Sequence, residues 1–163
     1  MKKTILTLAL VVTMVGTLMA QADGKTIGLR LGYPTEISFQ TGLNNVNRLD
    51  LGIGLRRYAY GNNSHYGLLE LSGVYQWVWD LSALSKGFNW YAGVGASLGY
   101  YSYTFANYSY TGTPVAVLGQ VGIEYNFDIP LRLSLDWRPA FQFNANGNGF
   151  IGDEIALGIR YRF

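Results

Sequence analysis

Ser64 and His65 are the residues of this sequence that most directly suggest catalysis. His65 is the single histidine of the chain, and it follows Ser64 within the segment GNNSHYG. A hydroxyl next to an imidazole can begin a nucleophilic hydrolase site if a carboxylate from another loop, such as Asp153, orients the ring. Because geometry rather than adjacency defines such a triad, we expect a loop histidine and assign no catalytic residue.

The composition argues against other kinds of site. With no cysteine and one histidine, a zinc site is not expected, and we predict neither a metal nor a cofactor. GVGASLG, residues 93–99, is similar to a dinucleotide fingerprint, but it lies inside an alternating pattern with no helix after it. Lys and Arg total 12 against 10 Asp and Glu, and Lys2 and Lys3 account for the difference. A nearly neutral chain without a basic stripe argues against a nucleic-acid partner.

A larger set of charged residues shares one parity of a repeated alternation. In RLDLGIGLRRY, residues 48–58, four aliphatic residues alternate with arginine, aspartate and glycine. A period of two is typical of a β-strand whose faces meet different surroundings. Six arginines and six acids occupy the polar parity along the chain: Arg30, Arg56, Arg132, Arg138, Arg160 and Arg162, with Glu36, Asp50, Glu70, Glu124, Asp136 and Glu154.

The elements that must position these residues are strands throughout. Segments of this kind, separated by turn residues, repeat eight times, and each is about long enough to cross a bilayer at a tilt. The sequence therefore predicts an all-β fold, an eight-stranded antiparallel up-and-down transmembrane β-barrel. The predicted strands are 25–33, 35–43, 48–58, 67–79, 88–101, 113–127, 131–143 and 151–163.

Side-chain volume and charge indicate which face of the strands points into the lumen and which faces lipid. An eight-stranded barrel is only just wide enough for side chains to fill. The polar parity carries ten glycines, whereas the apolar parity carries all four tryptophans. An arginine facing lipid at the midplane would cost about 2–4 kcal/mol. We therefore expect the charged parity to face the lumen, with aromatic belts at both rims, and we disfavour a soluble sandwich. The glycines are residues 28, 32, 42, 52, 54, 93, 95, 99, 122 and 158.

The amino terminus predicts export. Lys2 and Lys3 precede an apolar run from Ile5 to Met19, and Ala20-Gln21-Ala22 forms a small-x-small cleavage pattern. The expected organisation is a cleaved signal peptide at 1–22 followed by one barrel domain at 23–163.

A tyrosine-rich segment, YYSYTFANYSYTG at residues 100–112, falls where an external loop is expected. Tyrosine offers large, stiff contact area suited to an extracellular protein or glycan. Alternatively, the strands extend past the membrane and the tyrosines belong to the belt. The candidate contact residues are Tyr101, Tyr103, Phe105, Tyr108 and Tyr110.

With this pattern of strands over residues 25–163, the chain resembles the small eight-stranded outer-membrane barrels of Gram-negative bacteria. Examples are the membrane domain of outer-membrane protein A, outer-membrane protein X and the opacity proteins. Its ending is similar to the signal that the barrel-assembly machinery recognises: Gly158, then Tyr161, then Phe163, with Ala156 replacing the usual polar residue. SLDWRPAF resembles barrels of the Bacteroidetes type. The resemblance implies an outer-membrane location among lipid and lipopolysaccharide, and assembly by that machinery; it singles out no activity.

Three functional hypotheses follow. A structural or surface-contact barrel, plugged by its balanced lumen charges, is the expectation. A narrow porin-like channel would use the same charges to select ions. A lipid-modifying enzyme would depend on Ser64 and His65.

Overall fold

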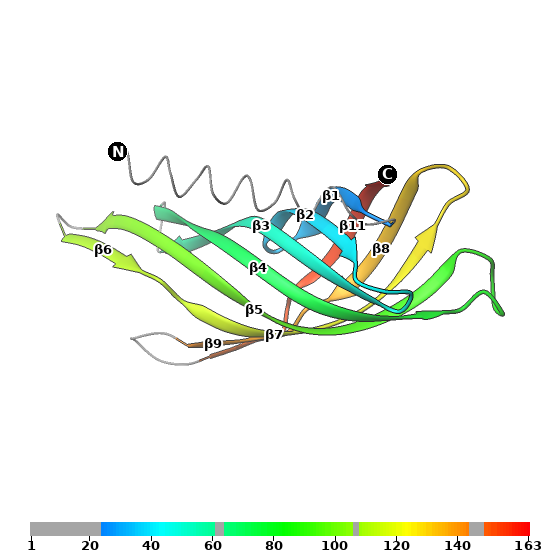
Figure 1. The fold of residues 1–163 in the computed structure, drawn as a ribbon. Helices are drawn as coiled ribbons and strands as arrows, with labels where there is room; N and C mark the ends of the chain where they lie inside the picture. The colour runs from blue at the N-terminus through cyan, green and yellow to red at the C-terminus, as the bar shows by residue number, and fades with distance from the viewer. Residues whose placement is uncertain (1–23, 61–63, 106–107, 144–148) are drawn as a thin grey trace, which may run out of the picture.

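The chain forms a closed antiparallel β-barrel (Figure 1). The computed structural model describes residues 24–60, 64–105, 108–143 and 149–163. No helix in these ranges is long and apolar enough to span a membrane. The strands are β1 (Thr26–Gly32), β2 (Thr35–Gly42), β3 (Asn47–Tyr60), β4 (Ser64–Asp80), β5 (Phe88–Phe105), β6 (Tyr108–Gly112), β7 (Val115–Asn126), β8 (Leu131–Trp137), β9 (Ala140–Phe143), β10 (Gly149–Ile151) and β11 (Ile155–Arg162).

These segments make eight barrel strands. β6 and β7 both pair with β5, β8 and β9 both pair with β7, and β10 and β11 continue one another beside β9 and β8. β1 pairs with β11, from Thr26 opposite Arg162 to Gly32 opposite Ala156, and this pairing closes the barrel. The predicted fold class is therefore confirmed.

Two prolines explain interruptions that the alternation did not predict. Pro114 separates β6 from β7, and Pro139 separates β8 from β9 within the predicted unbroken strand 131–143. Proline has no N–H to donate to the ladder, so it breaks regular pairing. The carbonyl oxygens still accept bonds, from Gly99 N to Pro114 and from Gly119 N to Pro139. The barrel wall therefore stays continuous across both breaks.

The two ends of the barrel differ. The terminal rim, as we name it, holds Gly24, Phe163 and the turns at 43–46, 81–87 and 127–130. At the opposite hairpin rim, β1 turns into β2 at residues 33–34, whereas β3 continues to Tyr60 and β5 to Phe105. The wall is therefore much taller along β3–β6 than along β1–β2, as the long strands on one side of Figure 1 show.

One loop prediction is corrected by these tall strands. Ser64 and His65 lie in β4, opposite Tyr60 and Ala59, and not in a loop. Residues 101–105 pair with 108–112, so the strands extend into the tyrosine-rich segment, as one of the two alternatives for this segment expected. The side chains of residues 57–60, 64–66 and 103–109, and all of residues 1–23, lie outside the described part. The predicted signal peptide therefore stays a prediction.

Exposure alternates along the strands as the period of two requires. In β7 each exposed apolar residue, such as Val117, is followed by a buried one, such as Leu118. The outer surface is apolar, with Ile37, Ile53 and Leu135 each at least half exposed. Trp79 stacks on Trp90 at 4.2 Å near the terminal rim, and further ring pairs on that rim join Phe88 to Tyr125, Tyr125 to Phe127 and Tyr161 to Phe163.

Candidate functional site: the charged barrel interior

Charged side chains fill the interior in three clusters stacked along the barrel axis. Ten of the twelve residues expected in the lumen are buried, and Arg132 and Arg162 near the terminal rim are partly buried. The strands position them because every second residue of a strand faces the same side of the sheet. We describe the clusters from the middle outward.

The central cluster balances three arginines against three carboxylates. Asp136 accepts from Arg30 through Nε at 2.9 Å and lies 2.8 Å from its Nη2. The hydroxyl of Tyr91 donates to the second carboxylate oxygen at 3.1 Å. Both Arg30 nitrogens approach the same carboxylate oxygen, and because Arg30 and Asp136 are fully buried, this ion pair is well shielded from water.

The other half of the central cluster centres on Arg138. Its Nη1 donates to Glu36 at 2.8 Å, and its Nη2 lies 3.5 Å from Asp50. Arg160 approaches the same Asp50 oxygen at 3.6 Å, and Arg30 reaches Glu36 at 3.4 Å. Glu36 and Asp50 therefore each contact two guanidinium groups, and Arg30 joins Asp136 to Glu36, which links the cluster into one network. Serine hydroxyls complete it, with Ser38 donating to Asp50 and Ser72 to Glu36.

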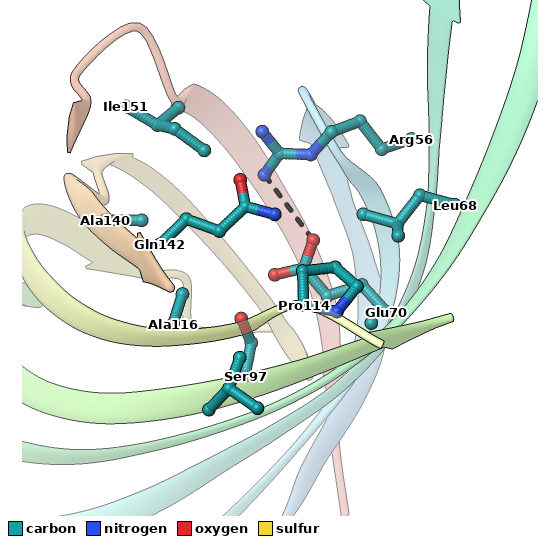
Figure 2. A pocket seen from close by; sticks show the side chains of 11 residues that line it. Arg56, Leu68, Glu70, Ser97, Pro114, Ala116, Ala140, Gln142 and Ile151 are labelled. Carbon is teal, nitrogen blue, oxygen red and sulfur yellow. Dashed lines mark hydrogen bonds and ion pairs between the residues drawn. The ribbon is translucent and has the colours of Figure 1, made fainter. Parts of the chain in front are cut away.

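The hairpin-rim cluster has one arginine for two acids. Arg56 pairs with Glu154, and its Nη2 lies 3.5 Å from Glu70. Figure 2 shows Arg56 above Glu70, with Gln142 and Ser97 on the facing strands. The cavity between them has a volume of about 10 Å³, on the scale of one water molecule.

The terminal-rim cluster has an excess of arginine. Glu124 is held by Arg48, with contacts of 2.9 and 2.6 Å, and lies 3.7 Å from Nε of Arg132. Arg132 also bonds to Asn126 and Gln40. Arg162 donates to the carbonyl oxygens of Phe127 and Ile129 and so caps the β7–β8 turn.

Sequence reasoning missed two interior residues that bind into these clusters. Arg48, the first residue of the predicted strand 48–58, was not among the twelve residues expected in the lumen. It shares the parity of Asp50 and is 6% exposed. The expected balance of six against six is therefore wrong, since a seventh arginine enters the lumen. Tyr91 is fully buried, and the signal available in the sequence was that it shares the parity of Gly93 and Gly95.

One side of the interior is apolar, which the alternation did not predict. Val74, Ala116, Leu118 and Ala140 form a buried cluster, with Ile151 packed against it. These residues lie on β4, β7 and β9, whereas the arginines come mainly from β1, β3, β8 and β11. This apolar patch is bordered by buried polar side chains of the same strands, Ser72 and Gln76 on β4 and Gln120 on β7.

Interior glycines make room for the neighbouring wall and side chains. A Cβ on Gly28 would lie 2.0 Å from the carbonyl oxygen of Ile159, so the backbone itself would have to move. A Cβ on Gly158 would lie 2.2 Å from Ser134 Oγ and 2.3 Å from Arg160 Nη1. Gly158, expected both among the interior glycines and in the assembly signal, therefore has a packing role. Tyr161 and Phe163 are more than half exposed.

We expect Gly28→Ala to lower the free energy of unfolding by about 1–3 kcal/mol, the usual cost of overpacking. Urea unfolding of the refolded protein, followed by tryptophan fluorescence, measures this change. Gly67→Ala is the matched control, because nothing lies within 4 Å of a Cβ at that position. Equal stability of the two variants would contradict the assigned packing of β1 against β11.

The interior carboxylates are committed to arginines. Each of Glu36, Asp50, Glu70, Glu124, Asp136 and Glu154 lies within ion-pair distance of at least one guanidinium group. Among the residues that the structure describes, no group of three or more His, Cys, Asp or Glu could hold a metal ion. Of the candidate contact residues, Tyr101 is partly exposed and Tyr110 is 45% exposed on the tall hairpin; the side chains of Tyr103, Phe105 and Tyr108 lie outside the described part.

Solved structures share this architecture. Neisserial surface protein A matches with a TM-score of 0.64 and 14% identity, over 86% of this chain and 94% of that one. The chain has the fold of the small outer-membrane β-barrels. The N-terminal β-barrel domain of Pseudomonas aeruginosa OprF matches with a TM-score of 0.60 and 13% identity, over 88% of this chain and all of that domain. No family model and no curated protein sequence matches the chain.

Proposed function

We propose that this protein is an integral outer-membrane barrel, exported through its signal peptide, with a structural or surface-contact role and a sealed lumen. The observation that carries the proposal is the combination of an apolar outer surface with an interior of paired charges. A soluble barrel would turn these two sets the other way, because exposed leucine, isoleucine and tryptophan on every strand are unfavourable in water.

The central cluster supports a sealed lumen. Arg30, Arg138 and Arg160 reach across the interior to carboxylates on other strands, and all three are at most 2% exposed. An ion crossing this level would have to displace a guanidinium from its carboxylate. Removing one partner of a buried pair is strongly unfavourable, so the network resists opening.

Planar-bilayer recording of the refolded protein tests the seal. We expect no steady conductance from the wild type, because an ion would have to displace a buried guanidinium from its carboxylate in the central cluster. Steady openings would contradict the sealed lumen. They would support the narrow channel instead, and in that case Arg132→Ala and Glu124→Ala should change the size of the openings.

The channel remains the second candidate because of cavities at both mouths. One of about 10 Å³ lies at the hairpin rim, and one of about 400 Å³ opens at the terminal rim. Only the central cluster and its neighbours separate them. A channel would therefore need a rearrangement of the ion pairs that Arg30, Arg138 and Arg160 make in the central cluster.

Surface contact is proposed for the tall hairpins. β5 and β6 carry the tyrosine-rich segment beyond the level at which β1 turns into β2. Tyrosine side chains at this height suit an extracellular protein or glycan. The lower part would lie in outer-membrane lipid and lipopolysaccharide, and the exposed Tyr161 and Phe163 would serve the assembly machinery.

No enzymatic role is proposed. Ser64 and His65 are consecutive residues of β4, and their side chains lie outside the described part of the structure. A lipid-modifying activity would need the two groups within hydrogen-bond reach, because a nucleophile must contact its base.

A further inference from the structure

A cavity of about 400 Å³ opens at the terminal rim, beside the arginine-rich cluster. Thr26, Arg132, Arg162 and Phe163 line it. Asp128 also lines it, but its carboxylate is 97% exposed and lies 3.9 Å from Lys86. The walls that reach into the barrel are therefore basic.

The charges of this region do not balance. Three arginines, Arg48, Arg132 and Arg162, share this end of the barrel with one buried carboxylate, that of Glu124. Arg48 engages that carboxylate through both of its oxygens. Arg132 reaches it only at 3.7 Å. No Asp or Glu side chain among the described residues lies within ion-pair distance of Arg162. Partly buried cations without an anion are unfavourable, so a bound anion would stabilise this rim.

The two arginines also keep unused donors. A guanidinium has five N–H groups. Arg162 uses Nη2 for two carbonyl oxygens, while its Nε is buried without a hydrogen-bond partner. Arg132 uses Nε and Nη1 for Asn126 and Gln40. Donors from two planar groups at one cavity match the several oxygens of a tetrahedral oxyanion.

We infer that the terminal-rim cavity binds a phosphate group through Arg132 and Arg162, with Thr26 at its wall. The phosphate can belong to a free ion or to the head group of a phospholipid in the adjoining leaflet. The chemistry is the same for both sources, and the experiment separates them.

Isothermal titration of inorganic phosphate into the protein in octyl glucoside, which contains no phosphate, is the first arm. Chloride is held constant throughout. We expect saturable binding of one phosphate per chain, at least tenfold weaker in Arg162→Gln and in Arg132→Gln. Lys86→Gln is the matched control, since Lys86 is an exposed cation of the same rim outside the cavity lining, and its affinity should equal that of the wild type.

Native mass spectrometry is the second arm. It compares retention of phosphatidylglycerol with that of diacylglycerol, which lacks the phosphate. Retention of phosphatidylglycerol that both arginine variants lose would support the inference and assign the lipid source, whereas binding of inorganic phosphate alone would assign the free ion. Absence of binding to the wild type in both arms, or equal binding by folded variants and wild type, would overturn it. Circular dichroism checks that each variant still folds into the barrel. If both arginine variants fail to fold, binding or its absence in the wild type decides the inference.

Discussion

Asp136→Ala should lower the free energy of unfolding by about 3–5 kcal/mol, the largest effect expected of any single carboxylate here. The substitution removes both close contacts of Arg30 and the acceptor of the Tyr91 hydroxyl. Arg30 is fully buried and would keep only Glu36, at 3.4 Å. Urea unfolding of the refolded protein in lipid vesicles measures the change.

Two companion variants make this result specific. Asp128→Ala removes an exposed carboxylate with a distant partner and should leave stability unchanged. The double variant Arg30→Met with Asp136→Leu replaces both charges by apolar groups and should recover most of the loss, because no unpaired charge remains. If Asp136→Ala proved as stable as Asp128→Ala, the central cluster would not support the fold as described.

Ile53→Arg should lower the stability of the barrel in vesicles by about 2–4 kcal/mol, the cost of arginine facing lipid near the midplane. Ile53 points outward from the part of β3 that pairs with β2 and is 56% exposed. This loss of stability depends on depth in the bilayer, so an arginine introduced nearer the membrane–water interface should cost less. Unfolding in vesicles of defined thickness provides the measurement.

Val46→Arg is the matched control for depth. Val46 is 55% exposed, nearly the same as Ile53, but it lies in the turn at the terminal rim. Arginine there should cost no more than about 1 kcal/mol, because it reaches the interface. Equal costs for the two substitutions would show that the outer surface of β3 does not lie in lipid, and the proposed location would fail.

Much of the fold was predictable because one physical rule acts on every strand. A narrow barrel needs small and charged residues inside and large apolar residues outside, and this requirement appears directly as a period of two. Ile53 and its neighbour Gly52 illustrate the rule, with the first exposed and the second inside. The strand extension at 101–105 was readable from the same pattern, since Tyr101, Tyr103 and Phe105 alternate with small polar residues.

The partners within the lumen could not be predicted from the sequence. Arg30 and Asp136 are 106 residues apart, and Arg48 and Glu124 are 76 residues apart. Which strands face each other across the lumen depends on tilt and stagger, and alternation does not contain either. Val74 and Leu118 were unpredictable for a related reason, because an apolar residue on the polar parity has no signature until its neighbours across the barrel are known.

The pairing of β1 with β11 has a consequence for how the protein is made. Hydrogen bonds join residues at opposite ends of the barrel sequence, Thr26 with Arg162 and Gly32 with Ala156. The seam cannot form until the last strand, β11, has been synthesised. Contacts of such long sequence separation are slow to form. Until β11 arrives, the outer edge of β1 has no neighbouring strand, and an unpaired strand edge can pair with another chain.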